Sequence, residues 1–132
     1  MEQVYQADGE GCWIACVSML TGVSYQDIKS RYKFRDEVTG RSAGPVVSLL
    51  DELGFDCDAR STKLSKIGAL KSLEADALVY TKNLSKKGKE KGGHWMVWDG
   101  TEQVLRDPEG WSSDRRRIIK NYRTVAKRSG AE

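Results

Sequence analysis

The chain has 132 residues, of which 39% are hydrophobic and 31% are charged, and its formal net charge is +3. This composition is typical of one soluble domain over residues 1–132, and it excludes a polycation. The longest apolar run, Trp13 to Val17, is far too short to cross a membrane. The N-terminus lacks the basic flank and apolar core of a signal peptide, so we expect a cytoplasmic protein. Three cysteines are an odd number, which argues against a closed disulfide framework.

The segment from Gln6 to Met19 predicts a glycine-containing loop that leads directly into a helix. From Cys12 to Leu20 nearly every residue is apolar or small, and Gly22 ends the run. So dense an apolar stretch indicates a helix that is buried on most sides. Cys12 lies at the junction between this loop and this helix.

A cysteine at the start of a helix is favoured as a nucleophile. Unpaired backbone N–H groups and aligned peptide dipoles stabilise a negative charge there by about 0.3–2 kcal/mol. This contribution alone does not ionise a thiol of ordinary pKa, about 8.5, at neutral pH. A cationic partner is needed, and histidine is the usual one. The chain contains one histidine, His94.

Further helices are predicted in the first half of the chain and strands in the second. Ser24 and Asp27 form a plausible capping pair, and Pro45 to Leu53 forms an amphipathic helix that Gly54 ends. The remaining predicted elements are strands at 55–59 and 77–81, a short helix at 65–73, a Lys/Gly-rich loop at 83–93, a hairpin, and a basic helix or strand at 115–128. This order predicts an α+β fold.

The hairpin follows the histidine. Trp95 to Trp98 and Glu102 to Arg106 are its predicted strands, and Asp99-Gly100 is a hairpin turn signal. His94 then begins one strand, and Asp107 lies at the end of the other. We expect the two residues to be nearly opposite each other, where a carboxylate can orient an imidazole. Asp99 is the alternative orienting residue, but the turn itself explains it better.

These residues together resemble a known family. A glutamine, five intervening residues and Cys-Trp at a helix start are similar to the papain-like cysteine peptidases. A later histidine that opens a strand, with Asp-Pro after the next strand, is closest to their small bacterial branch. That branch includes the peptidases that process double-glycine leader peptides. The resemblance covers roughly 6–20 and 92–110, and it implies a nucleophile helix packed with further helices on a C-terminal antiparallel sheet.

The resemblance also implies a role for each motif residue. Cys12 would be the nucleophile, His94 the base, Asp107 the residue that orients His94, and Gln6 a donor to the oxyanion. The neighbouring residues Trp13, Gly93 and Trp95 are the expected substrate contacts. The implied reaction is hydrolysis of a peptide or isopeptide bond in a protein or peptide substrate, without a cofactor or metal. The same groups serve glutamine deamidation and transglutamination, so these stay open.

The other cysteines have simpler interpretations. Cys16 lies one helical turn after Cys12, where it is a core thiol or, alternatively, a resolving partner in redox chemistry. Cys57 is expected in the core. A zinc site formed by these three cysteines and His94 is disfavoured, because the ligands are scattered and no Cys-x-x-Cys pair is present.

The basic segments permit a different class of function. Lysines gather in 83–93, and arginines and lysines gather in Arg115 to Arg128. Such runs are usually solvated surface, but they could bind an acidic partner. No nucleic-acid-binding motif is visible, so we do not predict nucleic acid. The alternative hypothesis is therefore a catalytically silent binding module that acts through its basic C-terminal surface.

Overall fold

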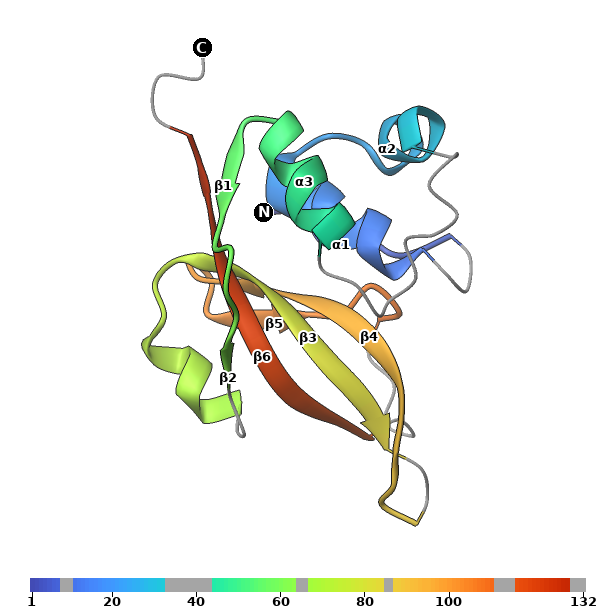
Figure 1. The fold of residues 1–132 in the computed structure, drawn as a ribbon, viewed down its shortest axis with the longest axis vertical. Helices are drawn as coiled ribbons and strands as arrows, with labels where there is room; N and C mark the ends of the chain where they lie inside the picture. The colour runs from blue at the N-terminus through green and yellow to red at the C-terminus, as the bar shows by residue number, and fades with distance from the viewer. Residues whose placement is uncertain (8–10, 33–43, 64–66, 85–86, 111–115, 129–132) are drawn as a thin grey trace.

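The computed structural model describes residues 1–7, 11–32, 44–63, 67–84, 87–110 and 116–128. In this part of the chain, three α-helices come first and an antiparallel sheet of six strands follows (Figure 1). The predicted α+β class is confirmed. The turn expected at Gly9 and the first residue of the basic segment, Arg115, lie outside the described residues.

The helices begin and end where the sequence predicts. They are α1 (Cys12–Thr21), α2 (Tyr25–Tyr32) and α3 (Gly44–Glu52). Gly22 ends α1 with φ of 80°, a left-handed conformation that glycine adopts without steric cost. The Ser24 side chain caps α2, because the Asp27 N–H donates to its Oγ at 3.1 Å.

The strands form one sheet in the order β1, β6, β3, β4, β5, and β2 also pairs with β6. Their bounds are β1 Phe55–Cys57, β2 Thr62–Lys63, β3 Asp76–Leu84, β4 Glu90–Asp99, β5 Val104–Arg106 and β6 Arg116–Lys127. The basic C-terminal segment is thus a strand, and it lies inside the sheet. The loop predicted at 83–93 is wrong at both ends, since β3 continues to Leu84 and β4 starts at Glu90.

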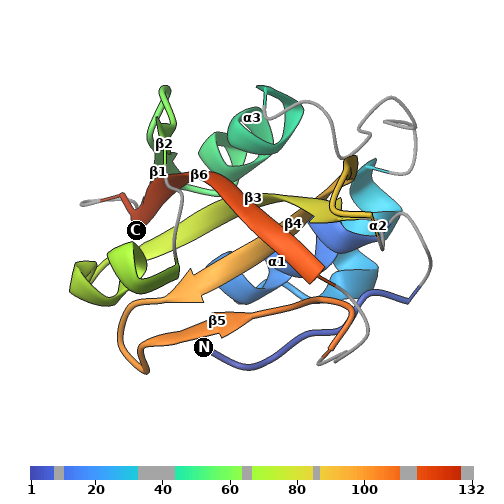
Figure 2. The same ribbon diagram turned by 90° about the horizontal axis from the view of Figure 1, so that it is seen from below.

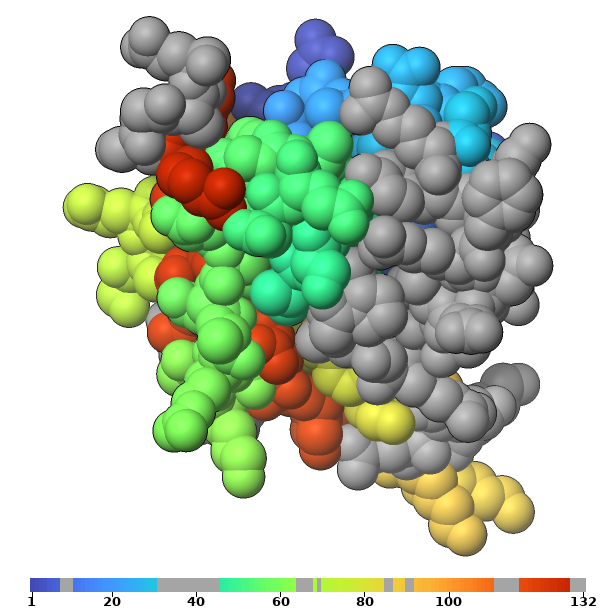
Figure 3. Space-filling model, turned by 45° about the horizontal axis from the view of Figure 1, so that its top comes forward, coloured from blue at the N-terminus to red at the C-terminus, as the bar shows by residue number. Residues whose placement is uncertain are grey.

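Both faces of the sheet are covered. On one face, Leu78, Trp95 and Val97 pack in a core cluster with α1, α2 and α3. On the other face, Met96 and Trp98 pack in a cluster with the short 3-10 helix η1 (Ile67–Ser72). Figure 2 shows the strands between α1 and η1, and Figure 3 shows α3 beside β1 and the end of β6. Residues alternate between the two faces along a strand, which explains why neighbours in β4 join different clusters.

A β-bulge in β6 changes which of its residues share a face with His94. Tyr80 pairs with Asn121, but the next residue, Thr81, pairs with Ile119, so Lys120 is an extra residue. Because the side-chain period of a strand is two, one extra residue moves every following side chain to the opposite face. Arg117 therefore lies on the face that carries Thr81, and Thr81 pairs with His94.

Candidate active site

Cys12 is the first residue of α1, and every residue from Cys12 to Leu20 is buried. The Ala15 N–H donates to the Gly11 carbonyl at 3.0 Å and closes the first helical turn. The N–H groups of Cys12 and Trp13 precede that bond and point out of the helix start, where they favour a negative charge. Cys12 as a whole residue is 8% exposed, so it is largely shielded from water.

His94 lies in β4 with its imidazole almost fully buried. Its Nε2 is 2.8 Å from Oδ1 of Asp107, which directly follows β5, and Thr81 Oγ1 donates to its backbone carbonyl at 2.9 Å. Since Asp107 holds Nε2, Nδ1 is the nitrogen available to the Cys12 thiol. The structure therefore brings together the three residues predicted as a triad.

The environment of His94 favours its charged form. Burial opposes the imidazolium, but hydrogen bonds with Asp107 and with the Cys12 thiol outweigh burial and raise the pKa of His94. Arg117 acts in the opposite direction through its charge. An imidazole that binds a proton more readily is a better base for a neighbouring thiol.

Asp107 is held as a carboxylate. Burial would raise its pKa, but hydrogen bonds from His94 and from the Glu109 N–H (2.9 Å to Oδ1), with the charges of His94 and Arg117, keep the pKa of Asp107 below its usual range. Its Oδ2 accepts a hydrogen bond from Nη1 of Arg117. Both oxygens are thus engaged, which fixes the plane of the carboxylate against the imidazole.

These two shifts predict how stability depends on pH. The contribution of His94 is complete below its unfolded pKa, about 6.5, and is lost as the pH rises through its folded value. The contribution of Asp107 is present above its unfolded pKa, about 3.9, and is lost as the pH falls through its folded value. The quantity to measure is the difference in unfolding free energy between the native chain and a His94→Asn variant, by urea denaturation. We expect this difference to be largest between the two unfolded pKa values, about 3.9 and about 6.5. A difference that is constant up to about pH 9 would contradict this expectation.

The N-terminal segment lies along the segment that carries Asp107. The Gln6 N–H donates to the Pro108 carbonyl at 2.8 Å, and Gln3 Nε2 donates to the Asp107 carbonyl at 2.9 Å. Figure 2 shows this segment running next to β5. Gln6 and Asp107, which are far apart in the sequence, are therefore held by adjacent pieces of backbone.

The three expected substrate contacts lie close to the triad in the fold. Trp13 and Trp95 are 6% and 2% exposed and share a core cluster with Cys12. Gly93 is half-buried, and a Cβ at this position would collide with the Tyr80 side chain. Tyr80 in turn packs on Trp95 with their ring centroids 4.8 Å apart. The two indoles thus belong to the core, and Gly93 is the more exposed of the three expected contacts.

Asp99, the alternative orienting residue, belongs to the turn after β4. It is 1% exposed, its Oδ1 accepts the N–H groups of Thr101 and Glu102 at 3.1 Å each, and its Oδ2 accepts from Nε of Arg106 at 3.0 Å. Burial would raise its pKa, but the Glu102 N–H and the Arg106 guanidinium lower it. Asp99 thus stabilises the turn.

The other two cysteines lie in unreactive surroundings. Cys16 is fully buried, and its pKa is raised well above the ordinary value by burial and by the charges of Cys12 and Asp107. Burial raises the pKa of Cys57, on β1, to about 11. Among the described residues, no group of three or more His, Cys, Asp and Glu side chains is placed to hold a metal ion.

Two residues of the site were not predicted as such. Glu109 Oε1 lies 3.6 Å from Nδ1 of His94, and Arg117 binds both Asp107 and Glu109. The observed hairpin register accounts for the position of Glu109. In this register β4 and β5 pair Val97 with Arg106. Counting from this pair three residues back along β4, and three residues onward past the end of β5, brings His94 opposite Glu109. Arg117 had no signal in the sequence beyond its place in a basic run.

Arginines of the basic strand are used within the chain itself. Besides Arg117, Nη1 of Arg123 donates to the carbonyls of Asp58 and Ala59, and Arg128 pairs with Asp51 and Asp56. The hydrogen bonds with Asp56 and Asp51 raise the pKa of Arg128. Their charge is therefore partly compensated before any partner binds.

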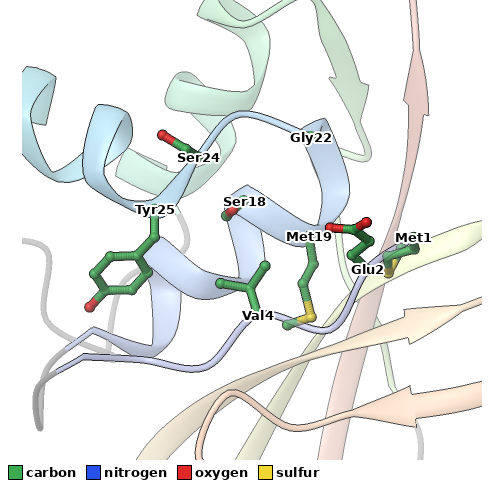
Figure 4. A pocket seen from close by; sticks show the side chains of 8 residues that line it. All are labelled: Met1, Glu2, Val4, Ser18, Met19, Gly22, Ser24 and Tyr25. Atoms are coloured by element: carbon green, nitrogen blue, oxygen red, sulfur yellow. The ribbon is translucent and has the colours of Figure 1, made fainter.

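A hollow of about 600 Å³ lies at the other end of α1 (Figure 4). The N-terminal segment, α1 and the start of α2 contribute its lining, which is Met1, Glu2, Val4, Ser18, Met19, Gly22, Ser24 and Tyr25. None of these residues belongs to the triad. The hollow is thus separate from the site around Cys12.

No family model, curated protein or solved structure matches the chain. No helix in the described ranges is long and apolar enough to cross a membrane.

Proposed function

We propose that the chain is a papain-like thiol enzyme of reduced size that hydrolyses a peptide or isopeptide bond. One observation carries this proposal: a cysteine at the start of a buried helix is hydrogen-bonded to the imidazole of His94, and a partly buried carboxylate 2.8 Å away holds the other ring nitrogen. A nucleophile, a base and a residue that orients the base are the three groups that covalent acyl transfer requires.

The reaction begins with transfer of the Cys12 proton to Nδ1 of His94. The thiolate sulfur then attacks the carbonyl carbon, and the carbonyl electron pair moves to oxygen. We assign the resulting oxyanion to the Cys12 N–H and the Gln6 side chain, which the resemblance to papain-like enzymes favours. Collapse of this intermediate breaks the C–N bond, and the amine leaves with the proton from His94.

The remaining thioester is hydrolysed in a second step. His94 takes a proton from water, the hydroxide oxygen attacks the thioester carbon, and the C–S bond breaks to release the acid. Cys12 regains its proton from His94, so the enzyme returns to its starting state. If an amine replaces water, the product is a transglutaminated or transpeptidated chain.

A peptide library tests the proposal. Purified protein is incubated with a mixture of peptides containing Gln and Gly-Gly sequences, with and without an added amine, and the masses are recorded over time. Hydrolysis gives two shorter peptides, deamidation replaces an amide by an acid in an intact peptide, and transglutamination adds the amine. We expect shorter peptides from the native chain, and none from Cys12→Ser.

The matched control is Cys57→Ser, which changes a thiol outside the site and should leave cleavage intact. Cleavage that persists in Cys12→Ser, or that disappears equally in both variants, would refute a nucleophilic Cys12. The absence of all three products would favour the binding module, whose basic surface is then tested by binding of an acidic polypeptide against ionic strength.

A further inference from the structure

Three charged side chains, Asp107, Arg117 and Glu109, form a closed ring with the imidazole of His94. Nε2 of His94 contacts Oδ1 of Asp107 at 2.8 Å, Oδ2 of Asp107 pairs with Nη1 of Arg117, and Nη2 of Arg117 contacts Oε2 of Glu109 at 3.0 Å. Oε1 of Glu109 lies 3.6 Å from Nδ1 of His94 and closes the ring. Each ring nitrogen of His94 thus faces its own carboxylate, and one guanidinium joins the two carboxylates.

The ring is built into the fold. The Arg117 side chain is 9% exposed, and its Nε donates to Oδ1 of Asn83 at 3.0 Å on β3. Three of its donors are therefore directed at fixed acceptors, which is a geometry that a planar guanidinium provides and an ammonium does not. The bulge at Lys120 makes this possible, since without it Arg117 would point from the opposite face of the sheet.

Glu109 is held from two sides. Its backbone N–H donates to Oδ1 of Asp107 at 2.9 Å, and its carboxylate is fixed by Arg117. The side chain is 22% exposed, so its charge is only partly screened by water. Among the residues that the structure describes, the charged and titratable groups around His94 are Cys12 from α1, Asp107 and Glu109 from the segment after β5, and Arg117 from β6.

We propose that Glu109 and Arg117 are positioning residues for the thiol reaction: Arg117 fixes both carboxylates, and Glu109 stabilises the proton that Nδ1 of His94 receives from Cys12. This inference depends on the proposed function, because a proton on Nδ1 matters only if Cys12 is the nucleophile. In this scheme Glu109 neither gives nor takes the transferred proton. Its negative charge favours the imidazolium, and Arg117 prevents the two carboxylates from repelling each other.

His94 is the one histidine of the chain, so the NMR signal of its carbon-bound Hε1 proton is not overlapped by another histidine, and its titration reports this site directly. We expect Glu109→Gln to lower the midpoint of that titration by about half a pH unit or more, because a negative charge next to Nδ1 is removed. The control is Glu102→Gln, the same change at an exposed turn position of the same hairpin, and its midpoint should not move.

Arg117→Lys tests the geometry at constant charge. We expect alkylation of Cys12 by iodoacetamide at about pH 6 to slow about tenfold in this variant, because an ammonium cannot hold both carboxylates in place. Arg123→Lys is the matched control on the same strand, since Arg123 donates to backbone carbonyls away from His94. Its alkylation rate should equal that of the native chain.

The outcomes separate this inference from the proposed function. If Glu109→Gln and Glu102→Gln titrate alike, the inference fails even when Cys12 is reactive and peptides are cleaved. If Cys12 of the native chain is inert but Glu109→Gln shifts the titration, the charge ring exists and the proposed reaction fails. If Arg117→Lys does not fold, the Glu109→Gln titration still tests whether Glu109 stabilises the proton on Nδ1 of His94.

Discussion

Replacing His94 by alanine is expected to slow alkylation of Cys12 at about pH 6 by about tenfold and to reduce turnover of a substrate by about a thousandfold. At this pH an ordinary thiol is less than about one per cent ionised, whereas a thiolate paired with an imidazolium is mostly ionised. The gain in thiolate is partly offset, because a more stable thiolate is a weaker nucleophile. Turnover falls further because His94 also protonates the leaving group.

The other two thiols serve as internal references in the same sample. Peptide mass spectrometry reads the three cysteines separately. Cys16 is fully buried and Cys57 has a pKa of about 11, so both should react slowly at about pH 6 in either protein. Equal alkylation of Cys12 in the native chain and in His94→Ala would remove the central support for the proposed enzyme.

The sequence predicted the helix of the site well, because local signals decide it. The apolar run after Cys12 and the glycine at position 22 determine both ends of α1, and the capping pair at Ser24 and Asp27 determines the start of α2. Such signals act over a few residues, so they do not depend on the rest of the fold.

The hairpin was predicted in outline but not in register. The sequence predicts the turn at Asp99-Gly100, whereas the chain continues through Gln103, which has a positive φ of 57°, before β5 begins at Val104. The longer turn moves the pairing, so that Glu109 rather than Asp107 follows the register opposite His94. Asp107 still reaches Nε2, because it lies beyond the end of β5 and its carboxylate is turned by Arg117.

Arg117 could not be predicted, because its role depends on contacts between distant parts of the chain. Its position opposite Asn83 follows from the pairing of β6 with β3, and its face depends on the bulge at Lys120. Neither feature has a local signal, since bulges and strand order are decided by tertiary packing. The same limit explains why the basic segment was assigned to a helix or strand without a place in the sheet.

A second large effect is expected from Gly100→Ala, which should destabilise the fold by about 3 kcal/mol and lower the melting temperature by about 10 °C. Gly100 is buried at the start of the turn after β4, and its N–H donates to Oδ1 of Asp76 at 2.9 Å. A Cβ here would lie 2.5 Å from the Ala75 carbonyl oxygen, and closer still to that of Glu74. These are backbone atoms that cannot turn away as a side chain could, so the turn must shift.

Gly92→Ala is the matched control, since a Cβ at Gly92, in the strand β4 that leads to this turn, meets nothing within 4 Å. Its unfolding free energy should differ from that of the native chain by less than about 0.5 kcal/mol. Because the turn at Gly100 leads through β5 to Asp107, a shift there should also lower the midpoint of the His94 NMR titration in Gly100→Ala at temperatures where the variant is folded. If Gly100→Ala is as stable as Gly92→Ala, then the turn does not pack against the backbone before β3 as described, and the placement of Asp107 beside His94 loses that support.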